Sequence, residues 1–331
     1  MARVLSGIQP TGDMHLGNYL GAVRRWVEEQ DTHDALYCVV DLHALTVDFD
    51  PATLAEQTRR TATLLLASGL DPERCTLFVQ SHVPAHTELT WFLNCVATVG
   101  ELRRMTQFKD KGQGQESVSV GLFDYPVLMV SDILLYDADE VPIGDDQRQH
   151  VELARDVAGR FNHRFGETFV IPKPTYPPIG ARVMDLQNPT NKMSKSSESV
   201  NGVVLLVDEP AVIAKKLRSA VTDSASEVRH DRDEKPGISN LVEILAAATG
   251  ATPAAVEAEF DGQGYGAFKS AVADAVVELL APVRERYLEL ERDPAEVDRL
   301  LAAGAAKARA QADTVLGRAR RAIGLLPHDG A

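Results

Sequence analysis

The chain has 331 residues, and 34 basic against 48 acidic side chains give it a formal net charge of −14 at pH 7. Charged residues make up 25% and hydrophobic residues 44% of the sequence, which is typical of a soluble globular protein with about two domains. The acidic balance argues against a protein that coats nucleic acid by bulk charge, but it does not exclude a local basic patch.

Several other classes of protein do not fit the sequence. No uncharged apolar run approaches the roughly 18 residues of a membrane span, and the N-terminus lacks the apolar segment of a signal peptide. Cys38, Cys75 and Cys95 are widely spaced and form no CxxC pair. We therefore expect neither a disulfide scaffold nor a cysteine-based metal site, and we expect a reducing, cytoplasmic compartment with no membrane partner.

Strand and helix patterns alternate through the first half of the chain. Residues 3–9 predict a strand and residues 17–30 a helix, and the nearly continuous apolar run at 35–45 is typical of a buried parallel strand. Asp50 and Pro51 are a favourable start for a helix that extends to about residue 68. The remaining predicted elements are a strand at 76–80, helices at 85–99 and 118–136, a short strand at 140–144 and a helix at 146–161.

The pattern changes near Pro172, where a proline-rich stretch indicates an irregular connector. Beyond residue 210 the chain is rich in alanine, and we expect helices at 241–248, 251–260, 268–290 and 294–325. Repeated strand–helix units followed by helices predict an α/β fold. We expect a Rossmann-like, doubly wound parallel sheet with a second, smaller all-helical domain, joined near residues 180–190.

The loop PTGDMHLGN, from Pro10 to Asn18, lies where the first predicted strand gives way to the first predicted helix. Ligands bind at this position in open α/β sheets, and free N–H groups at a helix N-terminus favour phosphate. Gly12 permits a tight turn, Gly17 permits close approach of a ligand, and His15 and Asn18 can donate hydrogen bonds to an oxyanion. The loop lacks the GxGxxG dinucleotide pattern, and an ordinary polar loop is the alternative.

A second motif, KMSKS, occupies residues 192–196 within a stretch rich in Gly, Pro and Asn. Two lysines with several hydroxyl groups on a loop suit a clamp that closes on phosphate. The alternative for this segment is a solvated basic loop.

The two motifs together, in this order and separated by the α/β layer, resemble those of the class I aminoacyl-tRNA synthetases. Further blocks narrow the resemblance to the bacterial tryptophanyl-tRNA synthetases. These blocks are SGIQPTG (6–12), GNYLGA (17–22), DLHALT (41–46), GELRRMTQFKDK (100–111), SDILLYDAD (131–139), VPIGDDQRQHVEL (141–153), KPGISNL (235–241) and GYGAFK (264–269). One departure is local: the family usually continues KMSKS with Asp-Pro, whereas this chain has Ser197 and Glu198.

The resemblance implies a tryptophan–tRNA ligase, which activates L-tryptophan with ATP to tryptophanyl-adenylate and pyrophosphate and then transfers tryptophan to tRNA(Trp). It implies Mg²⁺ held mainly by the ATP phosphates and a homodimer. It also implies a catalytic domain at 1–186 with a dimer-forming insertion at about 80–130, a helical anticodon-binding domain at 187–290, and a C-terminal helix at 291–331 that packs back toward the catalytic domain. A tyrosyl-tRNA synthetase and a catalytically reduced, synthetase-like regulatory protein are the alternatives.

Amino-acid activation needs no protein nucleophile, because positioning and charge stabilisation carry the reaction. By resemblance, the catalytic residues are His15, Asn18, Lys192 and Lys195. Lys111 is a candidate third cation, with a plain surface lysine as the alternative. The implied ATP-binding residues are Gln9, Pro10, Thr11, Gly17, Asn18, Gly144, Asp145, Asp146, Val183, Lys192, Met193, Ser194, Lys195 and Ser196. Asp145 and Asp146 also suit a helix N-cap.

Asp132 interrupts a very apolar run, from Tyr125 to Tyr136. A buried carboxylate is costly unless it accepts hydrogen bonds, and an indole ring offers one N–H donor and no acceptor. The residue suits tryptophan recognition, with helix capping as the alternative. The resemblance adds Leu5, Gln9, Val40, His43, Tyr125, Met129, Ile133, Val141, Ile143 and Gln147 to the tryptophan site, where core packing is the alternative for the apolar members.

Three clusters of basic residues are candidates for RNA contacts, although each also suits a solvated face. They comprise Arg103, Arg104, Lys109 and Lys111; Lys215, Lys216 and Arg218; and Arg318, Arg320 and Arg321. Two other signals carry no function. The glycine-rich segment at 262–266 has no strand before it and is expected to be a turn. Pro84 separates His82 from His86, so a zinc site on one helix is not expected.

Overall fold

The computed structural model describes residues 1–331 apart from 106–117, 145–146, 177–181, 196, 198 and 328–331. Its centre is a parallel sheet with the strand order β3-β2-β1-β4-β5. The strands are β1 (Arg3–Ile8), β2 (Asp34–Val39), β3 (Thr76–Val79), β4 (Glu140–Pro142) and β5 (Lys173–Thr175). The order reverses between β1 and β4, which is the switch point where ligands bind in doubly wound sheets. The predicted α/β fold class is confirmed.

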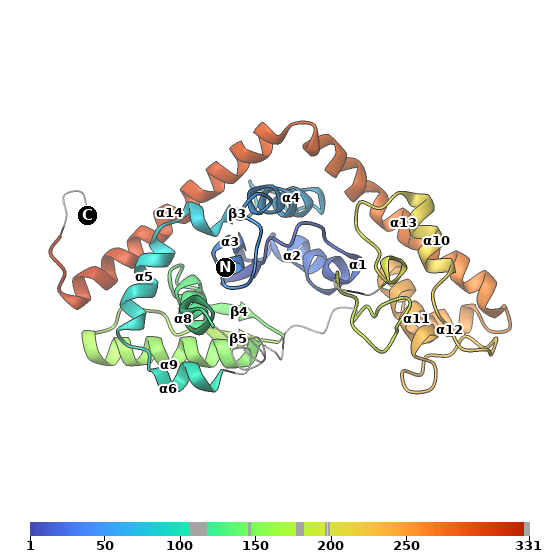
Figure 1. Cartoon of the computed structure of the whole chain (residues 1–331), viewed down its shortest axis with the longest axis horizontal. Coiled ribbons are helices and arrows are strands. Elements are labelled where there is room, and N and C mark those ends of the chain that lie inside the picture. Colours follow the sequence, from blue (N-terminus) through green and yellow to red (C-terminus); the bar gives the residue numbers. More distant parts are fainter. Residues whose placement is uncertain (106–117, 145–146, 177–181, 196, 198, 328–331) are drawn as a thin grey trace.

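Helices cover both faces of the sheet, and a helical part lies beside it (Figure 1). The first half contains α1 (Leu16–Asn18), a π-helical turn η1 (Tyr19–Val23), α2 (Arg24–Glu29), α3 (Asp41–Ala44), α4 (Leu54–Ala67), the 3₁₀ turn η2 (Gln80–His82), α5 (Ala85–Asn94), α6 (Val99–Arg104), α8 (Val120–Leu134) and α9 (Arg148–Phe165). The second half contains η4 (Val200–Gly202), α10 (Pro210–Arg218), α11 (Pro236–Thr249), α12 (Pro253–Glu259), α13 (Gly264–Glu291) and α14 (Pro294–Ile323).

Three of the differences between the predicted elements and the structure have a clear physical reason. The predicted strand at 35–45 is too long, because β2 ends at Val39 and α3 follows at Asp41. Both pieces are apolar, and a buried run does not by itself distinguish strand from helix. The predicted helix at 85–99 is too long, because α5 ends at Asn94 and a separate helix, α6, starts at Val99 after a capping box between Thr98 and Glu101. The proline-rich connector contains β5, where Pro174 is tolerated at the edge of the sheet.

The sheet is buried on both faces, as its alternating side chains show. Tyr37 and Val39 of β2 belong to the hydrophobic cluster on the face covered by α2 and α4, which continues into the helical part. Leu36 and Cys38 belong to the cluster on the face covered by α5, α8 and α9. The period of two along β2 therefore divides the core into two layers.

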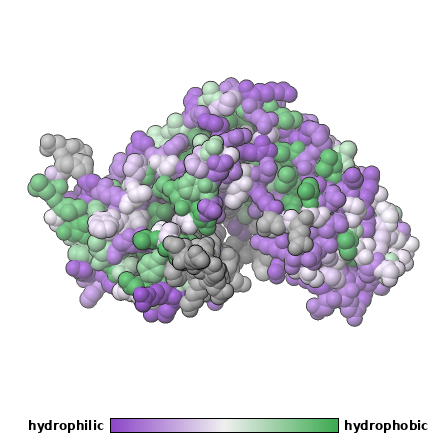
Figure 2. Space-filling view, in the orientation of Figure 1, coloured by the Kyte–Doolittle hydropathy of each residue, from purple (hydrophilic) through white to green (hydrophobic). Residues whose placement is uncertain are grey.

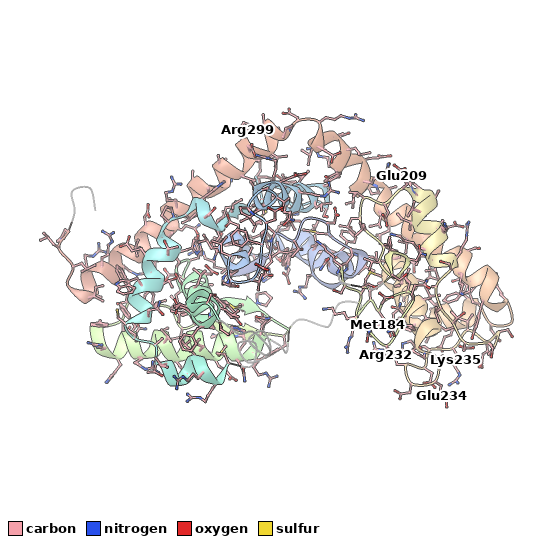
Figure 3. The ribbon with its side chains drawn as sticks, viewed as in Figure 1. Met184, Glu209, Arg232, Glu234, Lys235 and Arg299 are labelled. Carbon is pink, nitrogen blue, oxygen red and sulfur yellow. The ribbon has the colours of Figure 1, made fainter. Side chains whose placement is uncertain are left out.

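The helical part joins the connector through Met184, whose N–H and C=O groups both bond to the Asn240 side chain on α11. Figure 3 shows Met184 on the side of this part that faces the sheet. From there α13 and α14 form two limbs of an arch, and α14 crosses back over the sheet (Figure 1). Among the described residues no single helix is both long and apolar enough to span a membrane, and α11 with α12 pass that test only as a pair bent by 104°.

α14 approaches β3 so closely that one helical position must lack a side chain. A Cβ at Gly304 would overlap the carbonyl oxygen of Leu77 in β3. Backbone cannot yield as a flexible side chain does, so this contact requires glycine.

We expect Gly304→Ala to reduce the free energy of unfolding by about 1–3 kcal/mol, because overpacking against backbone forces the helix away from the sheet. Urea unfolding measures the change. Gly317→Ala on the same helix is the matched control, since its Cβ would meet only the end of the Arg321 side chain at 3.5 Å. Equal stability of the two variants would contradict this account of the α14 contact.

Candidate active site

A cavity of about 1350 Å³ opens at the carboxyl edge of the sheet, where β1, β2 and β4 end. Its position at the switch point and its mixed lining are typical of a ligand site in an open α/β sheet. The structure brings most of the predicted site residues together here. Those that line the cavity are Leu5, Gln9, Gly17, Asn18, Val40, His43, Tyr125, Met129, Asp132, Ile133, Val141, Ile143, Gly144, Gln147, Val183 and Lys192.

His15 and Asn18 form a reciprocal cap at the start of α1. The Asn18 N–H donates to His15 Nδ1 at 3.2 Å, and the His15 N–H donates to Asn18 Oδ1 at 3.1 Å. Nδ1 is therefore an acceptor, which leaves the hydrogen of a neutral His15 ring on Nε2. The Asn18 amide keeps its NH₂ group for another partner. Both side chains are thus fixed as hydrogen-bond donors beside a helix N-terminus, as an oxyanion requires.

The charge state of His15 follows from its surroundings. Burial lowers its pKa from 6.5 to about 4, and the nearby Lys195 and Lys192 act in the same direction. The ring is therefore neutral at pH 7. Gly17 leaves room for it, because a Cβ there would lie 3.1 Å from the His15 ring. Sequence reasoning assigned Gly17 to ligand approach, and the structure shows that it also accommodates His15.

The KMSKS segment lies against this first loop. Met184 and Lys192 form an antiparallel bridge, and the Met193 N–H donates to the Val183 carbonyl at 3.1 Å. Lys192 lines the cavity, whereas the Met193 side chain is buried in the hydrophobic core. Lys195 Nζ donates to the Thr11 carbonyl at 2.7 Å and to its hydroxyl at 2.8 Å. The two predicted motifs are therefore joined directly.

The pKa of Lys195 is lowered to about 8. Partial burial is the main cause, the neighbouring Arg60 adds to it, and Asp13 opposes it. Lys195 is still mostly protonated at pH 7. Lys192 and Lys195 supply positive charge on the side of the cavity next to the first loop, and His15 and Asn18 supply hydrogen-bond donors there. Both features suit phosphate.

The residue after KMSKS has a specific partner. The Ser197 hydroxyl donates to Oδ2 of Asp185, while Oδ1 accepts the N–H groups of Gln187 at 2.7 Å and Asn188 at 2.9 Å. Asp185 is buried, and Gly202 packs directly on its carboxylate. The departure from Asp-Pro noted at Ser197 therefore places a hydroxyl against a carboxylate at the base of the loop.

Asp132 lies at the opposite, apolar end of the cavity, and protein donors surround its carboxylate. Oδ1 accepts from Gln80 Nε2 at 2.6 Å and from His86 Nδ1 at 2.7 Å, and Oδ2 accepts from His43 Nε2 at 2.7 Å. Burial alone would raise the pKa of Asp132, but His43 and His86 outweigh it and hold the pKa well below the usual range. Asp132 is therefore an ionised acceptor, and the helix-capping alternative does not describe it.

Sequence reasoning missed Gln80, His86 and Arg182. Arg182 and His86 line the cavity, and Gln80 is fully buried behind Asp132. Pro84 does separate η2 from α5, as predicted, but His86 serves as a hydrogen-bond donor rather than a surface residue. No local pattern marks Gln80 and His86, because their partner Asp132 is distant in sequence.

Other predicted residues lie elsewhere or outside the described part of the chain. Pro10 is buried beside the cavity loop, and Thr11 contacts Lys195. Ser194 is described and makes an interaction of its own. Asp145, Asp146, Ser196, Lys109 and Lys111 lie outside the described residues.

Much of the predicted basic surface is engaged in ion pairs. Lys216 is buried and donates to Asp208 at 2.7 Å, Arg318 pairs with Asp137, and Arg320 pairs with Glu88. These cations balance acidic groups of the protein itself, so they are poorly placed to contribute to nucleic-acid binding.

Comparison with known proteins identifies the family. The model for class I tRNA synthetases of the W and Y type matches residues 1–281. The chain belongs to this family of class I tRNA synthetases, which confirms the resemblance drawn from the motifs.

Individual relatives share the whole length of the chain. Tryptophan–tRNA ligase 2 of Streptomyces avermitilis is 56% identical over 328 residues, which cover 98% of this chain and 97% of that protein. The tryptophanyl-tRNA synthetase of Mycoplasma pneumoniae superposes with a TM-score of 0.87 at 38% identity over 98% of each chain. That of Campylobacter jejuni, in complex with ADP and tryptophan, superposes with a TM-score of 0.84 at 35% identity, covering 98% of this chain and 100% of the other.

We expect Ser197→Ala to loosen the base of the KMSKS segment, because Asp185 loses one of its donors at a cost of about 1 kcal/mol. Amide exchange at Asn191 and Met193, whose N–H groups bond within this segment, should become roughly five-fold faster. Thr190→Ala is the matched control, since it removes an exposed hydroxyl hydrogen bond to Asn188 in the same loop. Equal exchange rates in the two variants would show that the Asp185 contact does not hold the segment.

Proposed function

We propose that the protein is a tryptophan–tRNA ligase, which converts tryptophan and ATP to tryptophanyl-adenylate and pyrophosphate and then transfers tryptophan to tRNA(Trp). The observation that carries the proposal is a buried, ionised Asp132 at the apolar end of a cavity whose other end carries donors and cations. This polarity fits an amino acid with an apolar ring, one ring N–H and a carboxylate that faces the phosphates of ATP.

In the proposed complex with tryptophan, two kinds of residue form the apolar end of the cavity. Leu5, Val40, Met129, Ile133 and Val141 provide apolar walls around Asp132. The indole N–H donates to the Asp132 carboxylate, and a ring without a donor leaves this buried acceptor with one partner fewer. Such a site discriminates by roughly 10⁴-fold or more without a separate editing step. Gln9, His43, Tyr125, Ile143 and Gln147 complete the pocket.

In the proposed complex, ATP occupies the opposite end of the cavity. His15 and Asn18 donate to phosphate oxygens, and Lys192 and Lys195 neutralise charge that develops on the leaving pyrophosphate. Positioning the tryptophan carboxylate in line with the α-phosphate provides the rest of the rate enhancement. Gly144 with its two following aspartates suits the adenosine ribose, and the residues of the first loop and of KMSKS hold the phosphates.

Mg²⁺ is the expected companion of ATP. The described residues hold no cluster of three histidine, cysteine or acidic side chains that could bind a metal ion. Mg²⁺ usually binds through substrate phosphates with few protein ligands. We therefore propose that it enters with ATP and is held mainly by the phosphates.

Activation of tyrosine is the second candidate, because the family model includes enzymes for both amino acids. A phenol hydroxyl can also donate to a carboxylate. The full-length relatives at 49–56% identity carry the tryptophan name, which favours tryptophan. Pyrophosphate exchange with each amino acid separates the two: we expect exchange with tryptophan, and exchange with tyrosine instead would contradict the proposal. A folded protein without exchange would indicate the catalytically reduced alternative.

Asp132→Asn tests the recognition step directly. The Asn oxygen is expected to face the two donors at Oδ1, which turns the amide NH₂ toward His43 and the indole N–H, so donors then oppose donors. We expect kcat/KM for tryptophan in the exchange reaction to fall roughly 10³-fold while KM for ATP changes little.

Asp124→Asn on the same helix is the matched control, because Asp124 accepts one hydrogen bond from Asn94 and lies outside the cavity. Its kinetic constants should match those of the parent protein. An Asp132→Asn variant that loses tryptophan and ATP affinity equally would contradict the assignment of Asp132.

We further propose that the enzyme is a cytoplasmic homodimer that binds tRNA through its helical domain, with domains at 1–186, 187–290 and 291–331. Large apolar side chains support an interface within residues 80–130, since Trp91 of α5, Val99 of α6 and Val120 of α8 are 68%, 57% and 80% exposed. Hydrophobic residues also gather on the half of the molecule that carries these helices (Figure 2). Exposed apolar patches of this kind mark association surfaces.

Trp91→Glu should convert a dimer to a monomer at micromolar concentration, because the interface would have to bury an unpaired charge. Light scattering after size exclusion measures the mass. Leu326→Glu is the control, since Leu326 is 91% exposed beyond the end of α14, and this variant should remain dimeric. A parent protein that is monomeric, or a Trp91→Glu variant that stays dimeric, would count against this interface.

A further inference from the structure

A chain of buried hydrogen bonds extends from Asp132 through His86 to Tyr136. His86 Nδ1 lies 2.7 Å from Asp132 Oδ1, and His86 Nε2 lies 2.7 Å from the hydroxyl of Tyr136. His86 and Tyr136 are both fully buried, and the ring of Phe78 stacks on His86 at an interplanar angle of 26°. Three polar groups in series within an apolar layer need an explanation beyond packing.

The direction of each hydrogen bond in this chain is determined. Among the described residues, His86 Nε2 is the acceptor within reach of the Tyr136 hydroxyl, so Tyr136 donates to it. A neutral His86 then carries its hydrogen on Nδ1 and donates to Asp132. Burial and the nearby Cys38 and Asp132 raise the pKa of Tyr136 well above its ordinary value, so the hydroxyl keeps its proton.

A hydrogen bond also fixes the orientation of the side-chain amide of Gln80, the second donor to Oδ1. The Leu42 N–H donates to Gln80 Oε1 at 3.2 Å, which turns the Gln80 NH₂ group toward Asp132. Oδ1 thus has two donors, each held by an outer partner. Within the described part of the chain, Oδ2 has one donor, His43, so one acceptor position remains on Oδ2. The carboxylate is therefore organised with its open acceptor position on Oδ2, beside a residue that lines the cavity.

We propose that His86 and Tyr136 are positioning residues for amino-acid specificity: Tyr136 sets the His86 tautomer, and His86 keeps Asp132 ionised with the open acceptor position of Oδ2 available to the substrate. The proposal rests on the proposed function and deepens it. Without the Tyr136 hydroxyl, only the Asp132 carboxylate favours a hydrogen on Nδ1, so the His86 tautomer with its hydrogen on Nε2 becomes more accessible. Nδ1 would then oppose Oδ1 as a second acceptor, and Asp132 would bind a proton more readily.

The test compares Tyr136→Phe with Tyr37→Phe. Tyr37 is equally buried, and its hydroxyl donates to the Trp26 carbonyl at 2.9 Å, so both variants lose one buried hydrogen bond. The readout is the ratio of kcat/KM in pyrophosphate exchange for tryptophan and for 3-benzothienylalanine, in which sulfur replaces the indole N–H. Where the analogue turns over too slowly, its inhibition constant replaces kcat/KM.

We expect Tyr136→Phe to lower the tryptophan-to-analogue ratio about ten-fold and to move the acid limb of kcat/KM for tryptophan to higher pH. Tyr37→Phe should leave both unchanged. A purely structural role for Tyr136 would weaken both substrates equally and leave the pH profile in place, and that result would overturn the proposal.

A second variant keeps the test decisive if Tyr136→Phe folds poorly. The Asn amide nitrogen occupies a position like that of His Nδ1, so His86→Asn can donate to Asp132 without help from Tyr136. His86→Asn should therefore keep the tryptophan-to-analogue ratio close to that of the parent protein, whereas His86→Leu, which has no donor for Asp132, should lower the ratio about ten-fold. Equal ratios in these two variants would refute the role of His86. Failure of the proposed function is distinguishable, because the parent protein would then show no exchange with tryptophan.

Discussion

The Asp132 carboxylate is a charge held inside the protein, and much of the site is arranged around it. An isolated buried carboxylate costs several kcal/mol, and donors with good geometry must offset that cost. The donors come from α3, η2 and α5, while Asp132 belongs to α8. α3 and η2 directly follow the parallel strands β2 and β3. The Asp132 carboxylate, which we propose recognises the ring N–H, therefore also links these segments at the carboxyl edge of the sheet.

The sequence was sufficient for the fold class and for the acceptor but not for its donors. Alternating strand and helix patterns predicted the layers, and the polar interruption of an apolar run singled out Asp132. Gln80 and His86 lie 52 and 46 residues before Asp132, and nothing local pairs them with it. The spacing of His82 and His86 bears only on a zinc site and says nothing of the contact between His86 and Asp132. The predicted boundaries of strands and helices were wrong where a continuous buried run shows no hydrophobic period, as between Val39 and Asp41.

Net charge proved less informative than the position of each cation. The molecule carries a charge of −14, and cations such as Lys216 and Arg318 are bound to its own carboxylates. Lys192 and Lys195 differ from these, because they lie by the cavity and the first loop and form no ion pair with a carboxylate of the described residues. Local positive charge suits a phosphate ligand, while the acidic remainder of the surface discourages indiscriminate binding of nucleic acid.

At the proposed phosphate end of the site, burial and neighbouring cations lower the pKa values of His15 and Lys195. Burial, with Lys195 and Lys192 nearby, lowers the pKa of His15 to about 4, and partial burial with Arg60 lowers that of Lys195 to about 8. Burial and neighbouring positive charge both favour the uncharged forms of these two groups. Bound phosphates would reverse these effects and favour protonation of both groups. Lys195 donates to the carbonyl and hydroxyl oxygens of Thr11. Phosphate oxygens can replace these two acceptors when ATP binds.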